Sequence, residues 1–553
     1  MERRISYLAP MKSLLKHPLF ITFVIYVSYI LIVFPFGQFA VNDDWVFKLQ
    51  VMAFNKGIWG IHASIDPSFI LHALLGVLWA KVFGVTFVSL RILIMVQSFL
   101  VLFGVYKIFL LYKKYNPTIL FFLLLVLANP LFLVSSFTFM TEISFLLFTI
   151  WSIYFILRYQ QSGSLWDVLF AGLLTGGSIL IRQSGVVLFI AFALTKKFKK
   201  STFLYLLLIV GFIAVWILWP RFDVSGQMEN GLLDTFSKVV RSEQLIGRLK
   251  LFLFSFSYIG FFILPFSLTR KKRALPFFIA VPLAIYIFSI DIFATGNIFY
   301  LEGLYIKTVY SVNFSLFDNL ITKFFVAYLN SYSLIVFVLW LGKNINKLTF
   351  EKFLLLSFLG HVSIIFLGND FYERYLFVAT ILLIVIIGIA TDKVKFSKVA
   401  IVGFVILFTI TGILQKDYYS QTKLRWSQAT KIHKLTNLTN QIYVDGTYRK
   451  YARALKMNDF TGVRSAKAGG HEYMCFVQKY TLDTNSKILK ITQGADEFFK
   501  QYIKNPRVFG SRKPQGFPKV KNNLDKLIFN DEYFSPLYNL VGKQAFVGSW
   551  CNE

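Results

Sequence analysis

The chain has 553 residues, of which 56% are hydrophobic and 18% aromatic, and its formal net charge is +30. This hydrophobic share exceeds that of soluble domains and indicates a protein that crosses a membrane many times. The positive charge could suit nucleic acid, but the lysines and arginines stand in short clusters between apolar stretches. That distribution is typical of cytoplasmic loops and argues against a nucleic-acid partner. With only two cysteines, the sequence encodes neither a cysteine metal cluster nor a disulfide framework.

Thirteen apolar stretches have the composition of transmembrane helices, and most reach the necessary length. The first, at 18–36, follows a short basic N-terminus and is too long for a signal-peptide core. The full set lies at 18–36, 88–111, 117–134, 140–158, 165–181, 185–195, 201–219, 250–268, 274–293, 325–342, 351–368, 375–391 and 398–415. The sequence therefore predicts an all-α polytopic membrane protein.

The apolar stretch at 69–83 is short and contains a histidine and a lysine, so we place it at the membrane surface. With the N-terminus in the cytoplasm, the inside segments then hold about 22 basic residues against about four acidic ones. This asymmetry is the one that the positive-inside rule expects, and a crossing at 69–83 would reverse it for every later loop. The same argument divides 165–195 into two short spans that turn at Ile181–Gly185, because an unbroken helix would bury Arg182 at mid-bilayer.

The region after residue 415 is polar, with about 23 basic and 11 acidic residues. It contains strand-like stretches at 441–444 and 487–491, separated by turn signals. We expect residues 1–415 to form the membrane domain and 416–553 to form a small external α+β domain, which docks either on an anionic acceptor or on lipid headgroups. Cys475 and Cys551 both lie in that region, where a disulfide and two separate structural cysteines are equally compatible with the sequence.

Carboxylates and arginines gather on the predicted external side of the membrane. The candidate residues are Asp43, Asp44, His62, Asp66, Glu142, Arg182, Glu373, Arg374 and Tyr375. An arginine can hold a phosphate at headgroup depth, and a carboxylate can accept a proton from an attacking hydroxyl or amine. Together they predict transfer of a group from a membrane-borne phosphate to a nucleophile.

Each candidate also has a purely structural interpretation. Asp43 and Asp44 can start a solvated loop, and Glu373 with Arg374 can form an interfacial pair. Arg182 can cap a helix or pair with Glu142. Histidines such as His62 and His72 more often pack or hydrogen-bond than bind a ligand. The shared side of the membrane favours the functional interpretation of the whole set.

Several motifs resemble those of bacterial GT-C glycosyltransferases, in the group of protein O-mannosyltransferases and lipid A aminoarabinose transferases. The chain carries Asn-Asp-Asp-Trp-Val-Phe after the first span, then Gly57-Ile-Trp, Asp66-Pro67 with Leu71-His72, Phe83-Gly84-Val, Ser89-Leu-Arg91, Asn129-Pro130, Glu142, Ile181-Arg182-Gln183-Ser-Gly185 and Glu373-Arg374-Tyr375-Leu. The resemblance covers about residues 15–415. It implies a core of 13 spans with surface-lying helices in the first external loop.

The resemblance also implies the chemistry. Asp43 aligns with the catalytic base, since Phe47 then takes the aromatic position four residues later, and Asp44 assists or orients it. Arg374 binds the lipid-linked phosphate, with Arg182 as a second candidate. The aminoarabinose branch has a lysine before a Pro-Pro pair in the first external loop, whereas this chain has Ile65-Asp66-Pro67-Ser68 there, which weakens the assignment to that branch.

The expected function is transfer of a hexose or pentose from a polyprenyl-phosphate donor, such as undecaprenyl phosphate, to an envelope glycan, lipid or protein at the bacterial inner membrane. The superfamily allows a divalent metal ion, but no ligand set in the sequence requires one. The alternatives are a transporter or flippase, an O-antigen polymerase or ligase, and a membrane scaffold. A transporter is expected to show mid-span charges and inverted repeats, whereas this sequence has few mid-span charges and no repeat. Arginines in the 220–249 loop keep the polymerase open.

Overall fold

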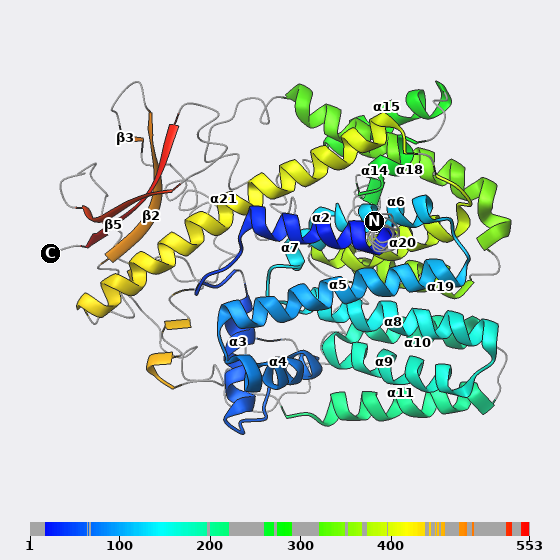
Figure 1. Ribbon diagram of the computed structural model, residues 1–553, viewed down its shortest axis with the longest axis horizontal. Coiled ribbons are helices and arrows are strands. Elements are labelled where there is room, and N and C mark those ends of the chain that lie inside the picture. Colours follow the sequence, from blue (N-terminus) through cyan, green and yellow to red (C-terminus); the bar gives the residue numbers. More distant parts are fainter. Residues whose placement is uncertain are drawn as a thin grey trace, which may run out of the picture.

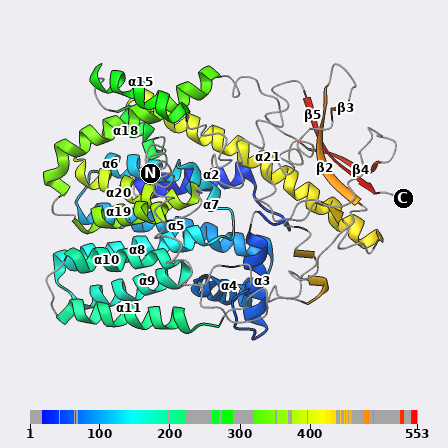
Figure 2. The same cartoon turned by 180° about the vertical axis from the view of Figure 1, so that it is seen from behind.

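The computed structural model describes a bundle of helices and, beyond one end of it, a small group of strands (Figure 1). The described residues are 17–41, 43–62, 65, 68–195, 200–220, 259–260, 262–269, 274–289, 320–348, 352–367, 373–394, 396–436, 442–443, 448, 451–452, 455–458, 475–483, 489–490, 527–533 and 543–551. Most bundle helices run along the same direction, and the view from behind shows the same arrangement (Figure 2).

The bundle helices consist mainly of apolar residues, whose side chains fill the space between the helices. The helices of the first part are α2 (Pro18–Val33), α3 (Asp44–Asn55), α4 (Ile70–Phe83), α5 (Phe87–Leu111), α6 (Asn116–Leu127), α7 (Pro130–Ser135), α8 (Thr141–Ser162), α9 (Leu165–Ile181), the 3₁₀ helix η2 (Gln183–Gly185), α10 (Val186–Thr195) and α11 (Lys200–Leu218). Those of the second part are α14 (Leu264–Ser267), α15 (Ala274–Ser289), α18 (Leu320–Leu348), α19 (Lys352–Leu367), the 3₁₀ helix η6 (Glu373–Tyr375), α20 (Leu376–Ala390) and α21 (Lys398–Thr436). All 15 residues of α20 are buried, so α20 lies at the centre.

The predicted spans largely coincide with observed helices. Each falls on a helix except 250–268, most of which lies outside the described residues. Asn129 and Pro130 divide the span predicted at 117–134 into α6 and α7, because proline lacks the amide donor that a continuous helix needs. The division of 165–195 is also observed, since α9 ends at Ile181 and α10 begins at Val186.

By length and composition alone, three of the described helices can cross a membrane, namely Phe87–Leu111, Thr141–Ser162 and Lys398–Lys434. Shorter apolar helices, such as Pro18–Val33 and Leu376–Ala390, have 10–17 residues. The structure is thus mainly helical and fits a polytopic membrane protein. The total of 13 spans stays a prediction.

Polar contacts between segments show which parts of the chain meet at each end of the bundle. At the first end, Lys114 lies 3.7 Å from Asp392, and the Thr118 hydroxyl accepts a hydrogen bond from the Val394 amide. All of these residues belong to or border segments predicted to be cytoplasmic. We call this the Lys114 end.

The opposite end joins the segments predicted to be external. Arg91 at the start of α5 contacts the segment between α2 and α3, and Arg374 contacts Asp43. The backbone amide of Ile61 donates to the carbonyl oxygen of Pro220, which follows α11. We call this the Asp43 end. The grouping agrees with the sidedness that the loop charges predict.

Helices α3 and α4 both lie at the Asp43 end. Figure 1 shows α3 running across the direction of the bundle helices. The first turn of α4 contacts the first turn of α8, where His72 Nδ1 lies 2.7 Å from Ser144 Oγ. Near its other end, Trp79 donates from Nε1 to the carbonyl oxygen of Ser89, in the first turn of α5. Because both ends of α4 contact helix starts at the Asp43 end, this helix does not pass through the bundle.

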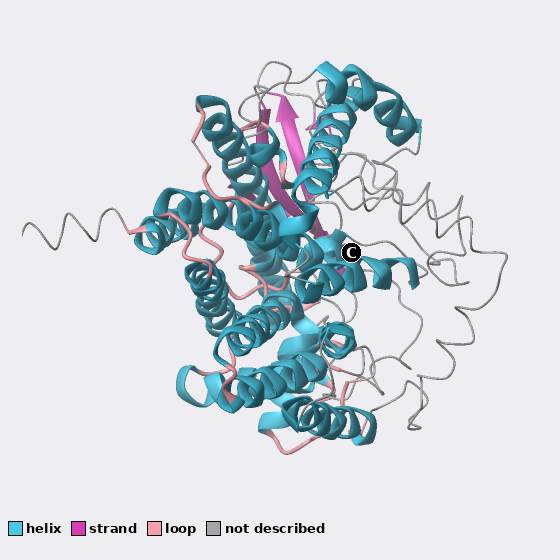
Figure 3. Ribbon diagram, turned by 90° about the vertical axis from the view of Figure 1, so that its right-hand side faces the viewer, coloured by secondary structure: helices cyan, strands magenta, loops and turns pink. Residues whose placement is uncertain are grey.

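The strands form one sheet, drawn in magenta in Figure 3. They are β1 (Ile442–Tyr443), β2 (Cys475–Asp483), β3 (Leu489–Lys490), β4 (Leu527–Tyr533) and β5 (Lys543–Cys551). The order is β1-β2-β5-β4, with β3 also paired to β2, and only the β1–β2 pair is parallel. The strand-like stretches predicted at 441–444 and 487–491 fall on β1 and β3.

Helix α21 connects the bundle to the sheet. It is continuous across residue 415, where the sequence predicts the domain boundary, and it contacts β2, β4 and β5. Its polar part passes the Asp43 end, where Tyr419 packs against Phe39 with ring centroids 6.1 Å apart and Trp426 packs against Phe87 at 5.7 Å. The C-terminal region is therefore anchored beside the segment that carries Asp43.

Candidate functional site

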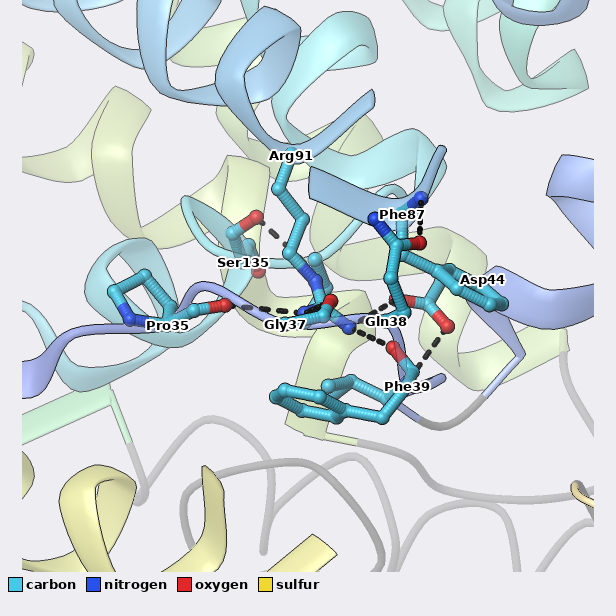
Figure 4. A network of polar contacts seen from close by, with 10 residues as sticks. Pro35, Gly37, Gln38, Phe39, Asp44, Phe87, Arg91 and Ser135 are labelled. Atoms are coloured by element: carbon cyan, nitrogen blue, oxygen red, sulfur yellow. Dashed lines mark hydrogen bonds and ion pairs between the residues drawn. The ribbon is translucent and has the colours of Figure 1, made fainter. Parts of the chain in front are cut away.

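A buried arginine holds the segment between α2 and α3 (Figure 4). Arg91, in the second turn of α5, donates from Nη1 to the carbonyl oxygens of Pro35 at 3.0 Å and Gly37 at 3.3 Å. Its Nη2 donates to the carbonyl oxygen of Phe39, and the guanidinium lies 4.3 Å from the centroid of the Phe39 ring. Three backbone carbonyls thus converge on one cation, which fixes the course of the chain just before Asp43.

Asp44 is the counter-ion of this arginine. Its Oδ2 accepts from Arg91 Nη2 at 3.2 Å, and its Oδ1 accepts from the backbone amide of Val41 at 2.6 Å. Both side chains of the ion pair are 0% exposed. Burial raises the pKa of Asp44 to about 7, and the charge of Arg91 opposes that rise. Because arginine stays protonated, the ionised form of Asp44 balances the buried charge. Asp44 is therefore a structural support of the segment.

Asp43 has the opposite environment. Its side chain is 47% exposed, and its Oδ2 lies 3.7 Å from Nη1 of Arg374. Arg374 belongs to η6, immediately before α20, and its guanidinium lies 5.7 Å from the centroid of the Tyr375 ring. Both charged side chains are partly accessible, so a ligand can reach them and replace either partner of the pair. The structure thus brings together the predicted base and the predicted phosphate ligand from positions more than 300 residues apart.

Glu142 and Arg182 form a second ion pair at the Asp43 end. Glu142 lies in the first turn of α8 and Arg182 follows α9, with Arg182 Nη1 3.0 Å from Glu142 Oε1. The carboxylate is 1% exposed, and its Oε2 has no hydrogen-bond partner among the described residues. A buried carboxylate without a cation is costly, so Arg182 serves first to neutralise Glu142. This is the structural alternative that the sequence left open for Arg182.

The turn that carries Arg182 depends on close backbone packing. A Cβ added at Gly185 would lie 2.4 Å from Ser178 Oγ and 2.7 Å from the backbone nitrogen of Ile179, which is closer than van der Waals contact permits. Ser68 fastens the same turn to the first loop, since its hydroxyl donates to Gln183 Oε1 at 2.8 Å and accepts from the Gln183 amide at 3.1 Å. Only glycine therefore allows the chain to turn here without displacing α9.

A buried lysine links α3 to the C-terminal region. Lys48 Nζ donates to the hydroxyl of Tyr451 at 2.8 Å and lies 4.1 Å from the centroid of the Phe87 ring. Burial lowers the pKa of Lys48 to about 8, and the nearby Asp44 carboxylate opposes this fall. Burial likewise raises the pKa of Tyr451 to about 12. The lysine thereby joins the helix that follows Asp43 to residues beyond α21.

The remaining candidates are described by contacts other than those of the Asp43–Arg374 pair. His62 is 2% exposed, its backbone amide donates to Gln50 Oε1 at 2.6 Å, and its ring packs edge-on against Trp45. Burial lowers the pKa of His72 to about 3, so it is a neutral packing residue. Asp66 and the side chain of Glu373 lie outside the described residues.

The described residues contain no cluster of side chains suited to bind a metal ion. No group of three or more His, Cys, Asp or Glu side chains there is close enough to hold one. Asp44 is fully engaged with Arg91 and Val41, and Asp43 lies against Arg374. The side chains that the structure describes therefore do not form a ligand set for a metal ion.

Sequence reasoning missed two side chains at the site. The motifs include Arg91 only within Ser89-Leu-Arg91, and they do not include Lys48. The signal for Arg91 was present, because it is a lone cation at the start of an apolar span. Its partners, from Pro35 to Asp44, cannot be identified without the fold.

Residues 67–219 match the protein family described as dolichyl-phosphate-mannose-protein mannosyltransferase. The match includes Arg91, Glu142 and Arg182, whereas Asp43 and Arg374 lie outside it. It confirms, over those residues, the resemblance to GT-C glycosyltransferases that the motifs indicate. No curated protein matches the chain.

Two solved structures of ArnT from Cupriavidus metallidurans also match. The one bound to undecaprenyl phosphate has 11% sequence identity and a TM-score of 0.38, over 80% of this chain and 76% of the other. The apo structure has 12% identity and a TM-score of 0.33, over 82% of this chain and 84% of the other. At this level of similarity they carry no argument about the site.

Proposed function

We propose that this chain is an integral-membrane glycosyltransferase that moves a sugar from a polyprenyl-phosphate donor to an extracytoplasmic acceptor. The observation that carries the proposal is the pair of adjacent aspartates with opposite environments. Asp44 is buried and bonded through both oxygens, whereas Asp43 is half-exposed and faces Arg374. The family match over residues 67–219 supports the class of reaction.

The proposed reaction is a single displacement at the anomeric carbon. The acceptor hydroxyl or amine attacks that carbon, and the Asp43 carboxylate accepts the proton that the nucleophile loses. The bond between the anomeric carbon and the phosphate oxygen breaks, and the lipid phosphate leaves with the bonding electrons. Arg374 stabilises the charge on the leaving phosphate through charge-assisted hydrogen bonds.

The contact between Asp43 and Arg374 implies that the donor binds before Asp43 acts as the base. At 3.7 Å, with both side chains partly exposed, the ion pair is weak and can be exchanged. A donor phosphate offers Arg374 two acceptor oxygens in place of the carboxylate. Donor binding then releases Asp43 to take a proton from the acceptor. A site without donor keeps its base paired.

The rest of the site positions these two groups. Arg91 and Asp44 fix the approach to Asp43, and Arg374 lies in η6, directly before the buried helix α20. Arg182 can contribute its exposed part to the donor phosphate while it neutralises Glu142. We place the Asp43 end on the outer face of a bacterial inner membrane and the N-terminus in the cytoplasm, because the described lysines Lys113, Lys114 and Lys393 lie at the opposite end.

The function is tested with purified protein in liposomes, radiolabelled polyprenyl-phosphate sugars and a membrane extract as the source of acceptor. A transferase moves the label from lipid to acceptor and releases polyprenyl phosphate. A flippase leaves the label on lipid and changes only its leaflet, and a polymerase or ligase requires a diphosphate donor. Transfer from diphosphate donors alone, or movement between leaflets without transfer, would overturn the proposal.

The role of Arg374 is tested in the same assay. Arg374→Ala should raise the KM for the donor about 10- to 100-fold, since one charge-assisted contact is worth about 1.5–3 kcal/mol. Asp392→Asn removes a carboxylate that is 75% exposed at the Lys114 end and serves as the control. An unchanged KM in Arg374→Ala would remove this arginine from the donor site.

A further inference from the structure

The two cysteines of the chain are directly opposite each other in the sheet. In the antiparallel pairing of β2 with β5, Cys475 is the partner of Cys551. Nine consecutive residue pairs, from Cys475–Cys551 to Asp483–Lys543, share this register. The sequence contains no other cysteine. The two residues that can form a disulfide therefore occupy the two positions of one cross-strand pair.

The backbone geometry of such a pair suits a disulfide. Directly opposite residues of an antiparallel pair have Cα atoms about 4.5 or 5.5 Å apart, depending on the hydrogen-bonding pattern. Disulfides span Cα separations of about 4.4–6.8 Å. Opposite residues also lie on the same face of a sheet, so both cysteines occupy one face.

We propose that Cys475 and Cys551 form a structural disulfide that fastens the C-terminal strand to the sheet. The pair lies where β2 begins and β5 ends, so it closes the end of the ladder from which the C-terminal strand would fray. This proposal uses the extracytoplasmic placement of the C-terminal region, since disulfides persist in oxidising compartments. It goes beyond the proposed transfer reaction and does not depend on Asp43.

The chemistry is a two-electron oxidation. The two thiols lose two protons and two electrons, and one S–S bond forms between the cysteine sulfurs. A disulfide-bearing oxidant in the extracytoplasmic space accepts them by thiol–disulfide exchange and becomes a dithiol. The exchange passes through one mixed disulfide, which the second cysteine of the pair resolves.

The full-length protein is tested in membranes that are quenched with acid and N-ethylmaleimide, which block every free thiol. After denaturation, maleimide-polyethylene glycol is added with or without prior reduction. We expect no gel shift without reduction and a shift of two labels after it. Peptide mapping should yield one linked pair of peptides, two hydrogens lighter than the separate peptides. A protein already fully blocked by N-ethylmaleimide before reduction would overturn the proposal.

A matched variant tests the register itself. Ser549→Cys combined with Cys551→Ser moves the cysteine two positions along β5, because Ser549 is the partner of Val477. The new pair is diagonal, with Cα atoms about 7–8 Å apart, beyond the usual limit of a disulfide. We expect free thiols in this variant. A disulfide that forms equally well there would show that the observed register does not determine the pairing.

A last variant separates the disulfide from the topology. Cys551→Ser leaves a single thiol at Cys475, which a membrane-impermeant maleimide labels in spheroplasts only if the C-terminal region is outside. Outside placement with free thiols in the parent protein overturns the disulfide alone. Inside placement overturns both the topology and the oxidising environment that the disulfide requires.

Discussion

Arg91→Met tests the buried pair that supports the segment before Asp43. The substitution keeps a long apolar side chain but removes the cation that binds Asp44 and the carbonyl oxygens of Pro35, Gly37 and Phe39. Removal of one partner from a fully buried ion pair costs about 3–5 kcal/mol, because the other charge stays buried without compensation. We expect a loss of stability in that range.

The assay is unfolding in mixed micelles, monitored as the fraction of denaturing detergent rises. Arg158→Met is the matched control. Arg158 lies 3.4 Å from Asp167, but its side chain is 49% exposed, and Asp167 also accepts a hydrogen bond from Ser162. Asp167 is 3% exposed, but it keeps the Ser162 hydrogen bond and its cation is half in solvent, so removal of Arg158 should cost less than removal of Arg91. If Arg91→Met costs no more than Arg158→Met, the buried pair does not support the segment.

A double variant separates charge from position. Arg91→Met with Asp44→Leu leaves no buried charge, and such apolar replacements often recover stability. The carbonyl oxygens before Asp43 still lack their donor, so transfer activity should stay low while stability returns. Recovery of both together would show that Arg91 acts only on stability.

Three further outcomes follow from the contacts. Burial lowers the pKa of Lys48 to about 8, so as the pH rises the folded state loses this proton before the unfolded state does. The stability of the parent protein, compared with that of Lys48→Met, should therefore increase from pH 7.5 to 9.5, by at most about 1.4 kcal/mol per pH unit. A flat difference would contradict this. Arg182→Ala should cost about 3 kcal/mol, because it strands the buried Glu142, whereas Arg374→Ala should cost less than about 1 kcal/mol; equal costs would refute the contrast. Gly185→Ala should destabilise by more than 1 kcal/mol in the same unfolding assay, since its Cβ meets backbone; a neutral result would show that the turn can open.

The sequence was informative about the fold wherever charge and length restrict the chain. The turn at Ile181–Gly185 could be predicted because Arg182 and the lysines after α10 cannot both be accommodated by one long helix. The strands at 442–443 and 489–490 could be predicted from short apolar patterns. The break between α6 and α7 is local chemistry too, but Pro130 can also occupy the first turn of a helix, so its effect was ambiguous.

The site was only partly predictable. Asp43, Arg374, Glu142 and Arg182 could be placed at one end of the bundle, because loop charge determines sidedness. The different environments of Asp43 and Asp44 could not be predicted, since the two are identical neighbours in sequence. Their difference arises from Arg91, 47 residues further along the chain, whose position depends on how α5 packs beside the α2–α3 segment.

The most direct measurement of the central claim is the rate of sugar transfer by Asp43→Asn, at equal amounts of folded protein and saturating donor. Asp43 is half-exposed, so this variant should keep the stability of the parent while its transfer rate falls about 10²- to 10⁴-fold, the usual contribution of a general base. Asp44→Asn should instead lose stability, because it removes the counter-ion of Arg91. A folded Asp43→Asn protein that transfers sugar at the parent rate would contradict the account.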